Sequence, residues 1–134
     1  MTTAPTDHAA ATAAAFLQGL ADQDFAQLGG ALAVDARLRA LLPKGLREWA
    51  GAEAVAGQFA HWFGDTTSFE LAEATVAEVG GRLHLRWRLR LRAERLGAGS
   101  FVVEQQAYAD TDEAGRIGRL DLLCTGYRPE GVDG

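Results

Sequence analysis

The centre of the chain is a strict alternation of apolar and basic residues over residues 82–92. Successive side chains of a β-strand point to opposite faces, so one face is apolar and the other carries only Arg and His. The apolar face consists of Leu83, Leu85, Trp87, Leu89 and Leu91. This pattern predicts a long strand whose Leu and Trp side faces the protein core.

Helical spacing of apolar residues precedes this strand. Residues 8–20 are expected to form a first amphipathic helix, and Asp22 is expected to cap a short second one. A third helix is expected after Gly51, with one continuous apolar stripe. The stripe consists of Val55, Phe59, Trp62 and Phe63.

The other segments have the composition and turn signals of strands. The expected strands cover residues 34–42, a short stretch ending at Trp49, and residues 69–79, 82–92, 101–110 and 116–127. Helices therefore come first and a long antiparallel meander follows. This order predicts an α+β domain whose helices gather on one face of a curved sheet.

Composition limits the further possibilities. A chain of 134 residues with 48% hydrophobic content fits one domain, which we expect over residues 8–128, between a flexible N-terminus (1–7) and a C-terminal tail (129–134). A net charge of −5 disfavours nucleic acid, and the single Cys124 precludes an internal disulfide. No metal spacing, signal segment or membrane-length run is present, so we expect a cytoplasmic protein without cofactor, nucleic-acid or membrane partners.

Four local segments resemble the SnoaL-like branch of the NTF2-like superfamily. They are Leu32-Ala33-Val34-Asp35-Ala36, the helix led by Gly51 with Phe59 and Phe63, Leu85-Arg86-Trp87-Arg88-Leu89, and Ala114-Gly115-Arg116-Ile117. The resemblance covers about residues 8–128. It implies an NTF2-like (cystatin-like) cone in which N-terminal helices pack on the concave face of a curved, mostly antiparallel sheet around a pocket. Relatives include isomerases, cyclases, epoxide hydrolases and proteins that only bind a ligand, so the fold alone selects no reaction.

The expected strand register indicates where such a pocket could lie. A two-residue turn at Gly80-Gly81 sets Ala74 opposite Trp87 and Ala72 opposite Leu89. Small residues beside large ones leave volume that either the third helix or a ligand must fill, because protein interiors tolerate few voids.

The next strand adds a polar group to this inner face. A loop at residues 95–99 that sets Glu94 opposite Ser100 places Gln105 inside, beside Leu89, and Ala107 beside Trp87. A buried amide needs a hydrogen-bond partner in the protein, in water or in a ligand. The expected pocket lining is Trp49, Phe59, Phe63, Trp87 and Gln105.

The basic face of the central strand is expected to be partly neutralised by neighbouring strands. The register pairs Arg88 with Glu73, Arg90 with Glu104 and His84 with Asp110. Such a face is either solvated or covered by a second copy of the chain. The resemblance implies the second possibility, a homodimer formed through the sheet.

A catalytic carboxylate is not prominent in the sequence. Ketosteroid-isomerase-like relatives would place a base at about residues 39–41, where this chain has none. Cyclases and epoxide hydrolases of this type use a buried Asp, for which Asp121 with Arg119 is the candidate pair.

The direction of Asp121 depends on the register of its strand. A four-residue turn at residues 111–114 points Leu120, Leu122 and Cys124 inward and leaves Asp121 outside, beside Glu104. A one-residue slip instead brings Asp121 and Arg119 inside. Three hypotheses for function therefore remain: binding of a small, mostly apolar ligand between the third helix and the sheet; an enzyme of the polyketide cyclase, isomerase or epoxide hydrolase type using Asp121; and a non-catalytic homodimeric module with a closed core.

Overall fold

The computed structural model describes residues 2–3 and 7–130. Helices α1 (Asp7–Ala21), α2 (Phe25–Gly30) and α3 (Ala52–Phe63) alternate with strands in the first half, and one short 3-10 turn, η1 (Glu94–Leu96), follows later. The strands are β1 (Thr2–Thr3), β2 (Leu32–Leu42), β3 (Gly45–Ala50), β4 (Ser68–Val79), β5 (Arg82–Arg92), β6 (Phe101–Thr111), β7 (Ile117–Cys124) and β8 (Arg128–Pro129). The predicted order of elements is confirmed.

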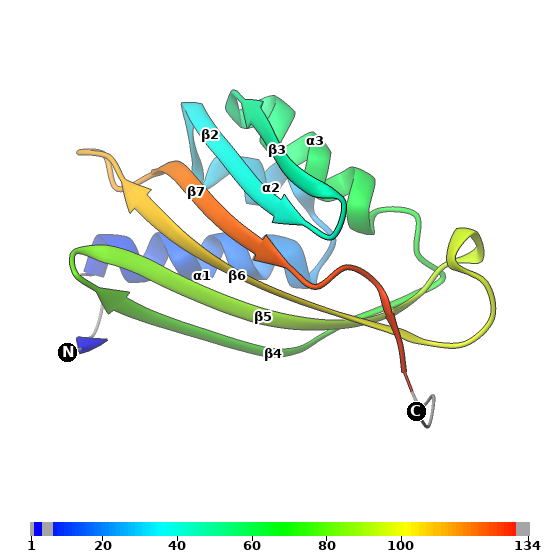
Figure 1. Ribbon diagram of the computed structural model, residues 1–134. Helices are drawn as coiled ribbons and strands as arrows, with labels where there is room; N and C mark the ends of the chain where they lie inside the picture. The colour runs from blue at the N-terminus through cyan, green and yellow to red at the C-terminus, as the bar shows by residue number, and fades with distance from the viewer. Residues whose placement is uncertain (1, 4–6, 131–134) are drawn as a thin grey trace.

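All strands belong to one sheet, in the order β1-β4-β5-β6-β7-β2-β3, with β8 beside β6 (Figure 1). Neighbouring strands are antiparallel except for β2 and β7, which run parallel. The early hairpin β2–β3 thus extends the sheet beyond the last long strand. This topology brings residues of β2 next to residues of β7 that are about 80 positions later, as in the pairing of Arg39 with Asp121.

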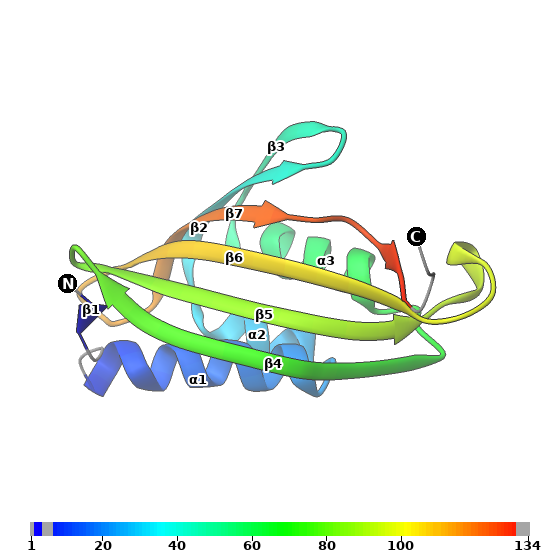
Figure 2. The same ribbon diagram turned by 60° about the horizontal axis from the view of Figure 1, so that its bottom comes forward.

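The helices lie on the concave side of the curved sheet, as predicted (Figure 2). Helix α1 runs along β4, and α3 contacts β2 and β3. The centre of the core is an aromatic cluster in which the Phe16 ring lies 5.5 Å from the Phe59 ring, edge to face, and 5.6 Å from the Trp87 ring. All three side chains are buried, so the middle of the interior is closed by packing.

The apolar stripe of α3 faces the core as predicted, with Val55, Phe59 and Phe63 buried. The predicted cap of α2 is wrong. Asp24 caps the helix through a side-chain oxygen that accepts from the Gln27 backbone N–H at 3.1 Å. Asp22 instead lies in the turn after α1. The two acidic residues are equally good caps by type, and only the length of α1 decides between them.

The register of β4 with β5 is confirmed near the turn, where Ala74 lies opposite Trp87. A bulge at Ala72 then shifts the pairing, so Leu71 rather than Ala72 lies opposite Leu89. Both Ala72 and Ala74 are exposed to solvent. The two alanines therefore do not enlarge an internal cavity.

The register of β5 with β6 differs from the prediction by two residues. Trp87 lies opposite Gln105, and Leu89 lies opposite Val103. The short turn η1 lengthens the connection, so the strands pair only from Leu91 and Phe101 onward. A shift of two preserves which face each side chain occupies, so Gln105 still points inward but contacts a different neighbour.

Residues 1, 4–6 and 131–134 lie outside the described part of the chain. The predicted flexible N-terminus (1–7) and C-terminal tail (129–134) stay predictions there. Within these ranges, Thr2–Thr3 pairs with β4, and Pro129 pairs with Phe101 of β6. No helix in the described ranges is both long and apolar enough to cross a membrane.

Candidate ligand pocket and outer groove

A pocket of about 520 Å³ opens at one end of the concave face. Its walls come from the end of α3, the turn between β2 and β3, the start of β6 and the segment that follows β7. Most of its lining is apolar, and the volume is typical of small-molecule sites, which cover roughly 300–1,000 Å³. The apolar lining consists of Leu42, Pro43, Trp62, Phe63, Leu96, Phe101, Val103 and Tyr127.

Gln105 and Cys124 contribute a polar contact between β6 and β7 at this pocket. The Trp87 indole N–H donates to Gln105 Oε1 at 2.9 Å. Since an indole can only donate, this bond orients the amide and turns Nε2 toward Cys124 Sγ, 3.2 Å away. Among the described residues, no other polar or charged side chain is buried as Gln105 is. The prediction that this amide points inward is confirmed.

Tyr127 forms a fixed wall of the pocket. Its hydroxyl donates to the Trp62 carbonyl at 2.6 Å and accepts from the Arg95 guanidinium at 2.9 Å. Arg95 lies over the Tyr127 ring at 4.9 Å and also binds Asp65 at 3.1 Å. Burial raises the pKa of the Tyr127 hydroxyl, although the hydrogen bond from Arg95 acts in the opposite direction. These contacts tie the segment after β7 to the end of α3 and hold Tyr127 in the pocket lining.

Two of the five expected lining residues, Phe63 and Gln105, line this pocket. Phe59 and Trp87 lie deeper, within the closed aromatic cluster, with ring centroids 6.4 Å apart. Trp49 packs edge to face on Trp62 at 5.7 Å, outside the pocket. The structure thus moves the cavity from the middle of the cone to its open end. The roles of these residues in binding stay predictions.

Sequence reasoning missed most of the wall. Phe101 and Val103 follow the same inward alternation as Gln105, so the alternation of β6 alone could have identified them. Tyr127 was expected at the end of a continuous strand, but β7 stops at Cys124. Gly126, with φ of 77°, then redirects the chain across the pocket mouth.

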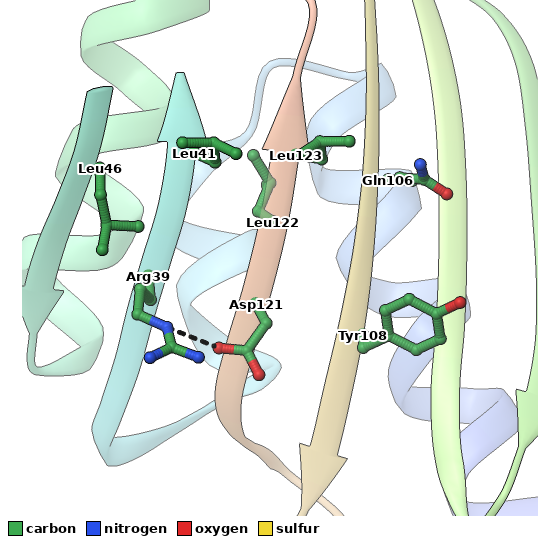
Figure 3. Close-up of a pocket in the computed structure, with 8 residues that line it drawn as sticks. All are labelled: Arg39, Leu41, Leu46, Gln106, Tyr108, Asp121, Leu122 and Leu123. Carbon is green, nitrogen blue, oxygen red and sulfur yellow. Dashed lines mark ion pairs between the residues drawn. The ribbon is translucent and has the colours of Figure 1, made fainter. Parts of the chain in front are cut away.

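A second hollow lies on the outer, convex face of the sheet, across strands β3, β2, β7 and β6 (Figure 3). It is a shallow groove, and exposed apolar side chains gather in it. Leu41, Leu46 and Leu123 are 49%, 52% and 47% exposed, and Tyr108 flanks them. We call this surface, lined by Arg39, Leu41, Leu46, Gln106, Tyr108, Asp121, Leu122 and Leu123, the outer groove.

Asp121 lies in the outer groove and not in the concave pocket. Leu120 and Leu122 are buried on the inner side, so the register with Asp121 outside is confirmed. The residue opposite Asp121 is Tyr108, however, and the predicted neighbour Glu104 is wrong. The turn between β6 and β7 is longer than predicted, since Thr111 pairs with Ile117, and a register shift between Asp110 and Thr111 adds to it. Together they move the partner of Asp121 from Glu104 to Tyr108, an even number of residues, so its face is unchanged.

Three guanidinium groups surround the Asp121 carboxylate. Arg82 lies 2.9 Å away, and Arg39 and Arg119 each lie 3.4 Å away. Burial opposes ionisation, but the hydrogen bond from Arg82 and the charge of Arg119 together hold the pKa of Asp121 below its usual value. The structure therefore brings the predicted pair Asp121 and Arg119 together, as an ionised structural pair on the outer face. Their catalytic role stays a prediction.

The outer face is partly neutralised, with partners that differ from the prediction. Glu104 binds Arg86 at 2.9 Å and Arg88 at 3.0 Å, and not Arg90. Arg90 pairs with Glu130 at 2.7 Å and with Glu70 at 3.1 Å. The hydrogen bonds from Arg88 and Arg86 lower the pKa of Glu104 against the opposing effect of burial. The shift of two residues between β5 and β6 accounts for this exchange of partners.

Of the other two predicted pairs on the outer face, one is confirmed and one is wrong. Arg88 lies 3.5 Å from Glu73, as predicted from the turn at residues 80–81. His84 Nε2 lies 3.1 Å from Gln106 Oε1, and its predicted partner Asp110 binds Arg82 instead. Among the described residues, no cluster of three or more His, Cys, Asp or Glu side chains is arranged to hold a metal ion.

Comparison with known proteins identifies the fold. No family model and no curated protein matches this sequence. Solved structures do match. A steroid delta-isomerase from Pseudomonas aeruginosa is 22% identical, with a TM-score of 0.64 over 96% of this chain and 85% of that one. An LEH-like epoxide hydrolase from M. tuberculosis is 20% identical, with a TM-score of 0.67 over 90% and 81%.

A third similar structure is described as SnoaL-like, the same term as the family that the sequence resembles. A protein classed as a SnoaL-like polyketide cyclase, from Shewanella denitrificans OS-217, is 12% identical, with a TM-score of 0.67 over 89% of this chain and 91% of that one. These three neighbours carry three different activities in their names, so the shared architecture does not select a reaction. The helices on a curved, mostly antiparallel sheet and the structural neighbours agree: this chain has an NTF2-like α+β fold.

Proposed function

We propose that this protein binds a small, mostly apolar molecule in the pocket at the open end of the concave face. The observation that supports this most is the lining itself. Aromatic and aliphatic side chains line an open pocket of about 520 Å³ beside the one buried amide of the described interior. Burying apolar ligand surface there contributes about 25 cal/mol per Å², which is the main driving force available.

Each part of the site has a distinct task in this proposal. Trp62, Phe63 and Phe101 hold the apolar body of the ligand. Gln105 supplies orientation, because one N–H of Nε2 binds Cys124 and the amide carries a second N–H for a ligand acceptor. The Trp87 indole keeps the amide in this orientation. The steroid delta-isomerase among the fold neighbours is named for an apolar substrate, which is compatible with such a site.

Binding is favoured over the enzyme hypothesis by the placement of the acids. No Asp, Glu or His is among the described residues that line the pocket. Asp121, the expected catalytic residue, lies on the opposite face of the sheet with three arginines around it. An enzyme using Asp121 would have to bind its substrate in the outer groove, where the carboxylate is already paired and ionised.

Adjacent leucines on β2 allow a sharp test of the pocket. Leu42 lines the pocket, whereas Leu41 points into the outer groove. Leu42→Trp should fill the pocket and weaken binding of the neutral fluorescent probe N-phenyl-1-naphthylamine by at least about tenfold, or ~1.4 kcal/mol. Leu41→Trp, its matched control, should leave the dissociation constant within about twofold. Fluorescence titration measures both, and thermal melts verify that both variants fold. Unchanged binding by Leu42→Trp would contradict the proposal.

We also propose that the outer groove is covered by a second copy of this chain. Three of its leucines are about half exposed, and their neighbours on the same face are arginines and carboxylates in comparable numbers. A two-fold interface places such a mixed surface against itself, so that Arg of one copy can face Asp or Glu of the other. Apolar side chains in a charged frame are typical of such contacts.

Substitution of Leu123 tests this interface. Leu123→Arg puts a cation into the apolar part of the outer groove and should weaken the dimer at least about tenfold. Val34→Arg is the matched control, since Val34 is 87% exposed on β2 but lies outside the outer groove. Size-exclusion chromatography with light scattering should give a dimer for the parent and for Val34→Arg and a monomer for Leu123→Arg. A monomeric parent protein, or equal behaviour of the two variants, would exclude this interface.

A further inference from the structure

We infer that the ligand of the pocket is an apolar anion, a carboxylic or similarly acidic molecule whose charge is held at the mouth by Lys44 and Arg128. The inference rests on the proposed ligand pocket and goes one step further, to the chemical class of the ligand. Among the described residues that line the pocket, two are charged, and both are cations. The chain as a whole has 18 acidic and 13 basic residues, so this local sign opposes the overall charge.

Both cations are available to a ligand. Lys44 lies in the turn between β2 and β3, Arg128 lies on β8, and both are exposed. Among the described residues, neither has an ion pair or side-chain hydrogen bond. Arginines of the outer face are different: Arg82, Arg86 and Arg88 each lie within 3.0 Å of a carboxylate oxygen.

The two cation-bearing segments are in direct contact, so they form one rim. Gly126 has φ of 77°, and a Cβ on it would lie 2.7 Å from Pro43 Cγ. Only glycine allows this approach of the segment after β7 to the β2–β3 turn. Lys44 follows Pro43 directly, and Arg128 lies two residues beyond Gly126. The close approach therefore places Lys44 and Arg128 at the same edge of the pocket.

The combination selects a particular class of ligand. The aromatic walls favour an apolar body, and the rim favours an anionic group that can take charge-assisted hydrogen bonds from Lys and Arg. An apolar cation would be repelled by the rim, and a neutral molecule would leave both charges unused. Because the cations are exposed and screened by solvent, each should change affinity only a few-fold.

A pair of probes separates the charge from the apolar body. The anion 8-anilino-1-naphthalenesulfonate and neutral N-phenyl-1-naphthylamine share one aromatic skeleton and differ by the sulfonate. The parent protein should bind the anion more tightly at low salt, and added salt should remove the difference. The double variant Lys44→Gln/Arg128→Gln should weaken binding of the anionic probe about five- to tenfold. Binding of the neutral probe should weaken less than about twofold. The matched control Arg37→Gln/Arg116→Gln removes the same net charge elsewhere and should leave both affinities unchanged.

The outcomes distinguish the two levels of the proposal. If Leu42→Trp abolishes binding of both probes but the Lys44 and Arg128 substitutions affect them equally, the pocket stands and the preference for an anion is overturned. If Leu42→Trp leaves both probes bound, the pocket itself is wrong and the inference fails with it. If the control double variant loses as much affinity for the anionic probe as the Lys44 and Arg128 double variant does, the effect is one of general charge. That result would also overturn the inference.

Discussion

Replacing Phe59 by alanine is expected to lower the free energy of unfolding by about 3–5 kcal/mol. The Phe59 side chain is buried, and its ring contacts Phe16, Trp62 and Trp87 at centroid distances of 5.5, 5.2 and 6.4 Å. Removing the ring leaves a cavity among aromatic groups that cannot close over it. A loss of this size is a large part of the 5–15 kcal/mol that typically stabilises a domain. Chemical denaturation measures it.

Phe101 provides the complementary variant. It is partly exposed at the pocket, so Phe101→Ala should cost only about 1 kcal/mol of stability but weaken probe binding about tenfold. Phe59→Ala, measured where the protein remains folded, should leave the probe affinity within about twofold. This crossed pattern separates the core from the binding site. If Phe59→Ala weakens binding as much as Phe101→Ala does, then Phe59 lines the site, as its sequence position first indicated.

Replacing Gln105 by leucine is expected to destabilise the fold by about 1–3 kcal/mol, although the two side chains are similar in size. The change removes the acceptor of the buried Trp87 indole N–H and the donor to Cys124 Sγ. A buried donor without an acceptor retains its full desolvation penalty.

A double-mutant cycle with Trp87→Phe isolates that hydrogen bond. Each single substitution leaves one buried polar group unpaired, whereas the double variant removes both partners. The double variant should therefore be more stable than the sum of the single losses predicts, by about 1 kcal/mol. Additive losses would mean that the indole and the amide do not depend on each other, and that Gln105 is oriented by something else.

Alternation and helix periodicity were enough to predict the order of elements, the inner face of the sheet and the stripe of α3. These features depend on local spacing, which a single sequence displays directly. The apolar face that includes Leu85 and Trp87 is buried as expected. The outward direction of Asp121 also followed correctly from counting the apolar residues on each face of its strand.

Positions that depend on loop geometry could not be predicted in the same way. The turn η1 shifts the register of β6 by two residues without changing the alternation, so Gln105 meets Trp87 instead of Leu89. The bulge at Ala72 shifts the pairing within β4, so Leu71 takes the place of Ala72 opposite Leu89. The break after Cys124 is specified by Gly126, whose close contact with Pro43 joins segments more than 80 residues apart. The rim cations Lys44 and Arg128 lie on these same segments. Hence the inner face was predictable, whereas the mouth of the pocket was not.

A two-dimensional 1H–15N NMR titration with N-phenyl-1-naphthylamine tests the central claim most directly, because each site has its own reporters. If the pocket binds the probe, the largest chemical-shift changes are expected at the Trp62 indole N–H, the Gln105 side-chain amide and the Gly126 backbone N–H. The chemical shifts of the backbone amides of Leu41, Leu46 and Leu123 should stay unchanged. Chemical-shift changes concentrated at those leucines, with no change at the Gln105 side-chain amide, would contradict the proposed pocket. They would show that the probe binds in the outer groove.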